Sequence, residues 1–456
     1  MESAATNTTR RLNANARELD LGRIEVLTPY QTPVLTQSCS KEHLQDEFHT
    51  DLRFNPMFLY RQCTKGDTAR IEQDNAVSQM PVILTIMSSN LNDLIASLKS
   101  SSDANEPSNT DNEPKMTYTR LGASGLKISK VILGAMSYGD PSQGNPWTLP
   151  ENEALPLLHH AFQRGINTWD TADIYGQGTS ELLIARAIAE YKIPRARLVL
   201  LTKLFFGVDP EVVKSGVTDF AMATENDGHM VNRVGLSRKH VFDAVEASVA
   251  RLGTYIDVLQ IHRFDPETPP EETMRALNDV VESGKVRYLG ASSMAAWQLQ
   301  MLNNVAEKHG WHKFISMQNY HNLIYREEER EMHPYCDFAG VGLIPWSPLA
   351  TGVLARPWSE MGATKRAQLN QYLAFMYSDA DKVIVDRVEE VSKELGQSMA
   401  SVAIAWSLQK GVNPILGLNS IERIDEAVGA VSLQLSKETV AALEEPYKAR
   451  PVAPLW

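Results

Sequence analysis

The chain has 456 residues, which is long enough for one large domain and an additional segment. Hydrophobic residues make up 43% of it and charged residues 22%, a balance typical of globular proteins rather than of fibrous or disordered chains. The formal net charge of −12 argues against general binding to DNA or RNA, because nucleic-acid backbones attract clustered lysine and arginine.

The cysteines and the amino-terminal region indicate in which cellular compartment the protein is located. The three cysteines, Cys39, Cys63 and Cys336, lie too far apart in sequence for a disulfide framework or a Cys-based zinc site, which favours a reducing compartment. The apolar run at residues 80–87 is too short to cross a bilayer, and the first residues lack the hydrophobic core of a secretory signal. We therefore expect a cytoplasmic protein that does not bind a membrane.

The composition changes near residue 115. Residues 99–115, "KSSSDANEPSNTDNEPK", contain almost nothing that could be buried, so they cannot offset the entropy cost of becoming ordered. We predict that residues 1–115 form a poorly ordered extension and linker, and that residues 116–456 form the organised domain. An alternative that the sequence leaves open is that Met116 is the true start, with the preceding residues coming from an over-extended gene model.

The organised domain begins with a predicted hairpin. Residues 118–130, "YTRLGASGLKISK", predict two short strands with Gly125 at their turn. After them, short apolar strands alternate with segments of helical periodicity. The predicted strands are residues 130–136, 166–172, 198–204, 257–263, 286–292, 314–319, 342–348 and 413–418. The predicted helices between them include residues 152–165, 180–192, 237–253 and 270–284.

These elements predict the fold class. Ser237 precedes one helix, and Gly253 and Gly284 follow two of them, as helix start and stop signals do. The strands are continuously apolar, which is typical of parallel strands covered on both faces. We predict an α/β protein with a (β/α)8 TIM barrel whose lower end is closed by the hairpin. The alternative, an open doubly wound sheet, normally carries G-x-G-x-x-G after its first strand, and "YGQGTSE" breaks that pattern at Glu181.

Polar residues follow the predicted strands at their carboxyl ends, where chemistry occurs in such barrels. In chain order they are Asp170 and Tyr175, Lys203, His262, Ser292 and Ser293, Gln318 and Asn319, and Trp346 and Ser347. Each alone has an ordinary structural explanation, such as a capped turn or a hydrogen-bonded core histidine. Together they would meet at one mouth, where buried charges must be paired.

The chemistry that requires this set is carbonyl reduction. A carbonyl that accepts hydride develops negative charge on its oxygen and needs a proton. Tyr175 would donate that proton, with its pKa lowered by the ammonium of Lys203 and with Asp170 holding the lysine in place. His262 would orient the carbonyl oxygen. Trp346 offers a flat face for a nicotinamide ring, although a tryptophan in this position is more often simply packed.

These residues also resemble a known family. The motifs "DTADIYG", "LLTKL", "LQIHRFD", "GASS", "QNYHNLI", "WSPLATGVL" and "PILGLNSIERIDEA" together resemble the aldo-keto reductases, across about residues 116–446. The resemblance implies a (β/α)8 barrel that reduces aldehydes and ketones with NADPH. It implies that the catalytic residues are Asp170, Tyr175, Lys203 and His262.

The resemblance also implies a set of cofactor contacts. They are Gly134, Met136, Asp170, Ser292, Ser293, Gln318, Trp346, Ser347, Pro348, Leu349, Gly352, Gly417, Asn419, Arg423, Glu426 and Ala427. Arg423 favours NADPH, because a guanidinium can hold a 2'-phosphate through two hydrogen bonds. Alternatively it pairs on the helix surface with Asp425 or Glu426. Many family members have Asn where this chain has Ser293 or Ala427, and some have Lys in place of Gly417.

Residues 237–265 and 325–336 resemble fungal family members of secondary metabolism, which implies a small carbonyl substrate, aromatic or polyketide-like. The long insertion at residues 205–237 would contact it. The insertion's large apolar residues either line a pocket or pack the loop, namely Phe205, Phe206, Phe220 and Met222.

Three other functions fit the sequence less well. A non-catalytic NADPH-binding subunit resembling potassium-channel β subunits would not need the complete catalytic set that this chain has. A short-chain dehydrogenase would have lysine four positions after its tyrosine, and no tyrosine here does. A metal-dependent enzyme is disfavoured because His159 and His160 are neighbours on a helix and the other histidines lack ligand spacing, so we expect no metal site.

Overall fold

A computed structural model gives the fold of the organised domain. It describes residues 115–142, 145–209, 226–364, 367–368 and 378–452. Residues 1–114 lie outside these ranges, so the division of the chain at residues 115 and 116 stays a prediction. Phe220 and Met222 also lie outside the described residues.

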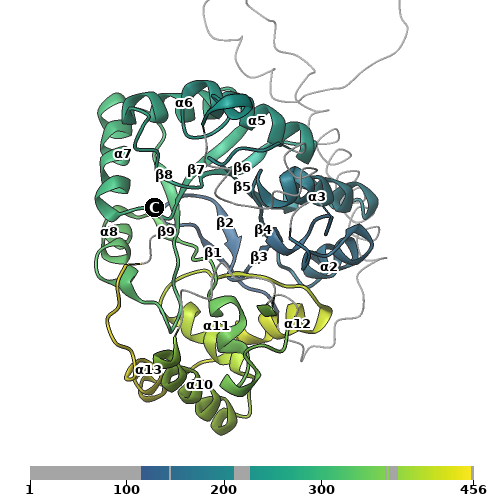
Figure 1. The fold of residues 1–456 in the computed structure, drawn as a ribbon, viewed down its shortest axis with the longest axis vertical. Helices are drawn as coiled ribbons and strands as arrows, with labels where there is room; N and C mark the ends of the chain where they lie inside the picture. Colours follow the sequence, from purple (N-terminus) through teal and green to yellow (C-terminus); the bar gives the residue numbers. More distant parts are fainter. Residues whose placement is uncertain (1–114, 143–144, 210–225, 365–366, 369–377, 453–456) are drawn as a thin grey trace, which may run out of the picture. The chain divides into compact units, whose positions relative to one another are not determined.

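An 8-stranded parallel sheet forms the centre of the domain, in the order β10-β3-β4-β5-β6-β7-β8-β9. Backbone hydrogen bonds of 2.9 Å, from Asn413 to Leu343 and from Ile415 to Pro345, join the first and last strands. Helices surround the strands (Figure 1). The (β/α)8 barrel is therefore confirmed, and each predicted strand segment overlaps one strand. The strands are β3 (Ile132–Gly134), β4 (Thr168–Asp170), β5 (Val199–Leu204), β6 (Ile256–Ile261), β7 (Val286–Ser292), β8 (Phe314–Gln318), β9 (Gly342–Leu343) and β10 (Ile415–Leu416).

The helices begin and end where the sequence signals lie. The Ser237 side chain accepts a hydrogen bond from the His240 amide, and Gly253 ends the same helix with a φ of 66°. No described helix is long and apolar enough to span a bilayer. The helices are α2 (Glu151–Gln163), α3 (Thr179–Glu190), α5 (Arg238–Leu252), α6 (Pro270–Glu282), α7 (Ala296–His309), α8 (Met332–Ala339), α10 (Lys382–Leu395), α11 (Met399–Gln409), α12 (Ile421–Ala430) and α13 (Lys437–Glu444).

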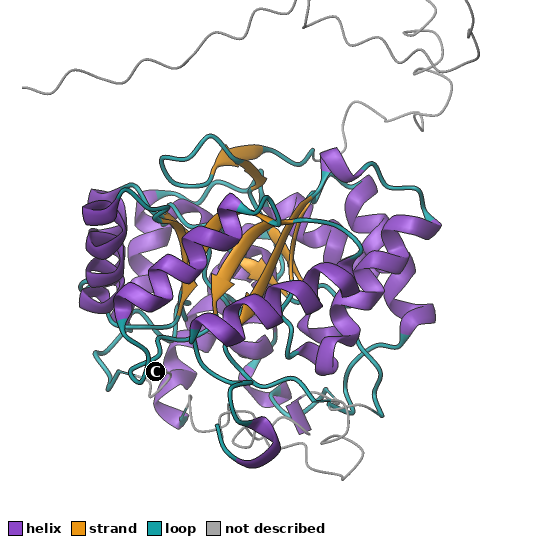
Figure 2. Ribbon diagram, turned by 90° about the horizontal axis from the view of Figure 1, so that it is seen from above, coloured by secondary structure: helices purple, strands orange, loops and turns teal. Residues whose placement is uncertain are grey.

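The hairpin of β1 (Tyr118–Arg120) and β2 (Lys127–Ser129) covers one end of the barrel (Figure 2). Leu121 and Ile128 form one hydrophobic cluster there with residues in or directly after the barrel strands, which are Ile132, Val199, Leu201, Val258, Ile344 and Ile415. The hairpin's position is thus confirmed. Gly125 lies in the turn between β1 and β2, as predicted. The turn also requires Gly122, which has a φ of 56° and no room for a Cβ beside Gly340.

Candidate active site

The predicted catalytic side chains come from one end of the barrel. Asp170 is the last residue of β4, Lys203 lies near the end of β5, and His262 follows β6. Tyr175 begins the short 3-10 helix η4 (Tyr175–Gly178) after β4. Because parallel strands of a barrel end on the same face, these four side chains share one mouth.

A buried ion pair forms the base of the site. Lys203 Nζ lies 2.6 Å from Asp170 Oδ2 and donates a 2.8 Å hydrogen bond to the Thr171 carbonyl. Both charged side chains are buried. Asp170 Oδ1 accepts hydrogen bonds from Gln260 Nε2 at 2.9 Å and from Gln318 Nε2 at 2.8 Å. Burial of two charges is tolerated when their remaining hydrogen-bonding atoms are also satisfied, as they are here.

The hydroxyl of Tyr175 completes this cluster. Lys203 Nζ lies 3.3 Å from Tyr175 Oη, within hydrogen-bond distance. Three left-handed residues follow the tyrosine and reverse the chain, with φ angles of 55°, 53° and 89° at Gly176, Gln177 and Gly178. The side chain of Gln177 accepts a 2.8 Å hydrogen bond from the Asp209 amide and so anchors this turn. Gln177 is the one residue of the three that is not glycine, and such an unfavourable conformation persists where the surrounding structure fixes it.

The pKa values of Tyr175 and Lys203 differ in part from the sequence prediction. Burial raises the pKa of Tyr175 above 10.0, and the charge of Lys203 only partly opposes this effect. The expected net lowering of the tyrosine pKa was therefore wrong, because the sequence does not reveal how deeply the phenol is buried. Burial also works to lower the pKa of Lys203, but Asp170 and Tyr175 outweigh it and the pKa is raised. The site thus holds a neutral phenol beside an ammonium ion.

His262 faces the tyrosine from the neighbouring strand. Its ring lies edge-on to Tyr175, with centroids 5.9 Å apart, and edge-on to Phe206, with centroids 4.9 Å apart. Burial, followed by the charges of Arg263 and Lys203, holds the pKa of His262 well below 6.5. Among the described residues, Nδ1 of this buried ring has no hydrogen-bond partner. A neutral imidazole can donate a hydrogen bond to a carbonyl oxygen without carrying charge.

A flat aromatic surface lies beside the cluster. The Trp346 indole stacks on Tyr320 with centroids 4.5 Å apart, and its Nε1 donates a 3.1 Å hydrogen bond to Ser293 Oγ. Ser292 Oγ donates to the Gln318 carbonyl at 2.8 Å. Since Gln318 also contacts Asp170, the polar residues predicted for a nicotinamide amide lie next to the cluster of Asp170, Tyr175 and Lys203.

The loop after Trp346 contains several left-handed residues. It runs into the 3-10 helix η9 (Ala350–Ala355). Left-handed φ angles occur at Ser347, Ala350, Thr351 and Gly352. Such conformations turn successive N–H groups toward one side of the backbone. Pro348 is buried in this loop and Leu349 is half-buried.

Arg356 was missed by the sequence analysis. A Cβ added at Gly352 would lie 3.3 Å from Arg356 Nη2, so the guanidinium lies against the loop. Burial, and then the nearby charge of Arg423, lowers the pKa of Arg356. Two cations whose charges repel each other are stabilised by a bound anion. The available signal was a basic residue shortly after the glycine of "WSPLATGVLAR".

Arg423 is exposed on the first turn of α12, where it donates a hydrogen bond to Asn419 Oδ1. Asp425 pairs with His160 and Arg164, at 2.9 and 2.8 Å, and Glu426 accepts a hydrogen bond from Ser398. The alternative that Arg423 pairs with Asp425 or Glu426 was therefore wrong.

The remaining predicted cofactor positions differ in exposure. Met136, which follows β3, is 38% exposed, and Gly417, which follows β10, is also exposed. Gly134 ends β3 so close to β10 that an added Cβ would lie 2.9 Å from the Ile415 side chain. The methyl group of Ala427 packs in the hydrophobic core. Gly134 and Ala427 therefore support the backbone around the site and offer no exposed side chain.

Comparison with known proteins gives a consistent result. The sequence model described as "Aldo/keto reductase family" matches residues 130–448. The chain is 57% identical over 344 residues to versiconal hemiacetal acetate reductase of Aspergillus parasiticus, covering 74% of this chain and 99% of that protein. It is 53% identical over 339 residues to a Schizosaccharomyces pombe protein named as an aryl-alcohol dehydrogenase, covering 74% and 97%. It is 50% identical over 343 residues to an aldo-keto reductase of Alternaria alternata, covering 74% and 93%.

Proposed function

The chain belongs to the aldo/keto reductase family and is an oxidoreductase, and from this premise we propose that it reduces an aldehyde or ketone to an alcohol with NADPH. The observation that carries the proposal is the 3.3 Å contact between Tyr175 Oη and Lys203 Nζ, at the barrel mouth beside His262. Together the three side chains supply a proton donor (Tyr175), a cation that stabilises the resulting phenolate (Lys203), and a neutral hydrogen-bond donor for the carbonyl oxygen (His262).

Several features of the mouth fit NADPH. Trp346 offers a face for the nicotinamide ring, and Ser292, Ser293 and Gln318 supply polar groups around it. The loop from Ser347 to Gly352, with Arg356 against it, fits the pyrophosphate, while Asn419 and Arg423 fit the 2'-phosphate. Bound NADPH supplies the hydride that the carbonyl carbon receives.

The geometry supports a role for each of the four side chains in the proposed reaction. His262 donates a hydrogen bond to the carbonyl oxygen and fixes its direction. As negative charge develops on that oxygen, Tyr175 transfers its phenolic proton to it. Lys203 stabilises the phenolate that remains, and Asp170 keeps the ammonium in position through the 2.6 Å contact. The apolar edge of Phe206 beside His262 helps to exclude water from these groups.

We propose an aromatic carbonyl compound as the substrate. One of the relatives bears on this, because it is named for an aryl alcohol. In this chain, Phe205 and Phe206 lie edge to face with centroids 5.1 Å apart, and Phe206 contacts His262. These rings would pack beside an aromatic group attached to the carbonyl.

The test is to follow NADPH absorbance with the full-length protein, a panel of aromatic aldehydes and polyketide-like ketones, and aliphatic aldehydes of similar size. The proposal expects NADPH oxidation with stoichiometric alcohol formation, fastest for the aromatic compounds. NADPH binding without oxidation across the panel would instead favour a purely regulatory NADPH-binding subunit.

Replacing Arg423 with alanine tests the choice of cofactor. We expect the Kd for NADPH to rise by about tenfold to a hundredfold, because a phosphate loses a charge-assisted hydrogen bond. The Kd for NADH, which lacks that phosphate, should change by less than about twofold. Isothermal titration with both nucleotides measures the difference. Equal losses for NADPH and NADH would refute the assignment of Arg423 to the 2'-phosphate.

A further inference from the structure

A four-residue segment after β8, Asn319–Asn322, is hydrogen-bonded to Trp346 and Ser347, two of the residues proposed to contact the cofactor. The Asn319 carbonyl accepts a 2.9 Å hydrogen bond from the Trp346 amide, and Asn322 Nδ2 donates to the Ser347 carbonyl at 3.0 Å. Between these anchors, Tyr320 stacks on the Trp346 indole. The position of this segment therefore sets the position of the aromatic surface proposed for the nicotinamide.

The next side chain of the same segment, His321, belongs to a different environment. It is fully buried, and its Nε2 lies 2.8 Å from Glu329 Oε1. Its ring stacks on Trp406 of α11, with centroids 5.2 Å apart and an angle of 23°. Because neighbouring side chains of an extended segment point to opposite sides, Tyr320 supports Trp346 while His321 reaches the helices behind it.

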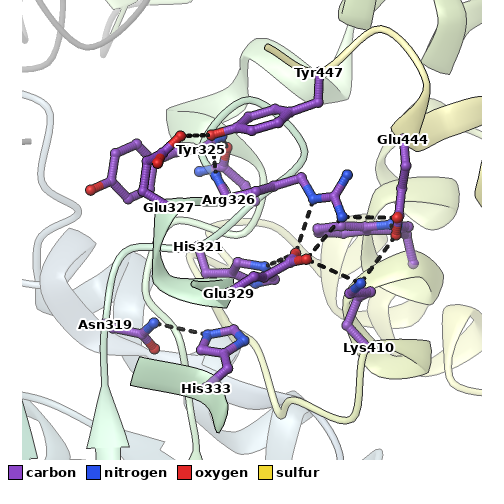
Figure 3. A network of polar contacts seen from close by, with 12 residues as sticks. Asn319, His321, Tyr325, Arg326, Glu327, Glu329, His333, Lys410, Glu444 and Tyr447 are labelled. Carbon is purple, nitrogen blue, oxygen red and sulfur yellow. Dashed lines mark hydrogen bonds and ion pairs between the residues drawn. The ribbon is translucent and has the colours of Figure 1, made fainter. Parts of the chain in front are cut away.

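An ion network holds His321 in place, and we define it as Arg326, Glu329, Lys410 and Glu444 (Figure 3). Arg326 binds Glu329 through two hydrogen bonds, at 3.0 and 2.8 Å, and Lys410 Nζ lies 3.2 Å from the same carboxylate. Glu444 of α13 contacts Arg326 at 2.8 Å and Lys410 at 3.3 Å. The network thus joins the loop after β8 to α11 and α13.

The charges of the network are mutually dependent. Burial works to raise the pKa of Glu329, but the hydrogen bonds of His321 and Arg326 and the charge of Arg326 hold it far below its ordinary value. A carboxylate that satisfies a histidine and two cations cannot lose its charge without leaving those donors poorly paired. Glu329 is therefore the residue on which the arrangement of the others depends.

We propose that Glu329, acting through His321, is a positioning residue for the nicotinamide end of the cofactor. This inference rests on the proposed function, because it takes Trp346 as the surface against which the ring packs. The chain of contacts runs from Glu329 to His321, along the backbone to Tyr320, and from its ring to Trp346. Neither Arg356 nor Arg423, which would hold the phosphates, takes part in this series of contacts.

The test compares two ligands, NADPH and 2',5'-ADP, which carries the adenosine phosphates but no nicotinamide. For Glu329→Gln we expect the Kd of NADPH to rise about threefold to tenfold, the scale of one aromatic stacking contact. The Kd of 2',5'-ADP should stay within about twofold of that of the parent protein. Glu331→Gln, an exposed glutamate of the same loop, is the matched control and should change neither value.

Three outcomes separate the possible explanations. Equal weakening of both ligands by Glu329→Gln, or no weakening of either, would overturn the positioning role. If Glu329→Gln does not fold, the same titrations with His321→Gln decide, because this change removes the ring that links Trp406 and Glu329. Failure of the parent protein to bind either nucleotide would instead refute the proposed function.

Discussion

Replacement of Tyr175 by phenylalanine should lower the rate of carbonyl reduction by about a hundredfold or more and leave NADPH binding nearly unchanged. The substitution removes only the hydroxyl that lies 3.3 Å from Lys203 Nζ. Without it, no phenolic proton is available for the oxygen that becomes an alcohol. The ring itself, which lies edge-on to His262, is retained, so the shape of the site should be preserved.

Single-turnover oxidation of NADPH with an aromatic aldehyde measures this effect apart from product release. Tyr118→Phe is a suitable control, since it removes the hydroxyl of an exposed tyrosine in the hairpin, at the other end of the barrel. The control should react as fast as the parent protein. If Tyr175→Phe also did so, another group would be the proton donor.

Replacement of Lys203 by methionine should destabilise the protein by about 3–5 kcal/mol and abolish most of the activity. The change leaves the carboxylate of Asp170 buried without its 2.6 Å partner. It also removes the cation that stabilises the phenolate of Tyr175. Urea unfolding measures the first effect, and single-turnover kinetics measures the second.

The double variant Asp170→Asn/Lys203→Met separates the two effects. Removing both charges should recover a large part of the lost stability, because no unpaired charge remains in the core. The activity should stay low, since the phenolate still lacks its cation. Losses of stability that simply add would show that Asp170 and Lys203 do not depend on each other.

The sequence predicted the barrel, and the meeting of Asp170 and Lys203 at its mouth, for a physical reason. Parallel strands covered on both faces are apolar along their whole length, so Asp170 at the end of one and Lys203 near the end of another are conspicuous. Gln260, which bonds to both Asp170 and Gln318, was missed although it interrupts the apolar strand β6. A polar residue within a strand is informative only when the face on which it lies is known.

Other features depend on contacts that no local pattern contains. Arg356 approaches Gly352 next to a run of left-handed residues, Ala350, Thr351 and Gly352, two of which are not glycine. The pairing of Arg326 with Glu444 joins residues far apart in sequence. The raised pKa of Tyr175 follows from its burial, which is a property of the whole fold. In each case the residue type was visible in the sequence, but its surroundings were not.

The transfer of deuterium from NADPH carrying two deuterium atoms at C4 of the nicotinamide is the most direct test of the proposed reaction. The full-length protein is mixed with this cofactor and an aromatic aldehyde, and the alcohol is analysed by mass spectrometry. The account predicts an alcohol with one deuterium on its carbinol carbon, formed rapidly by the parent protein and very slowly by Tyr175→Phe. An alcohol without deuterium, or intact aldehyde beside bound and unoxidised NADPH, would contradict it.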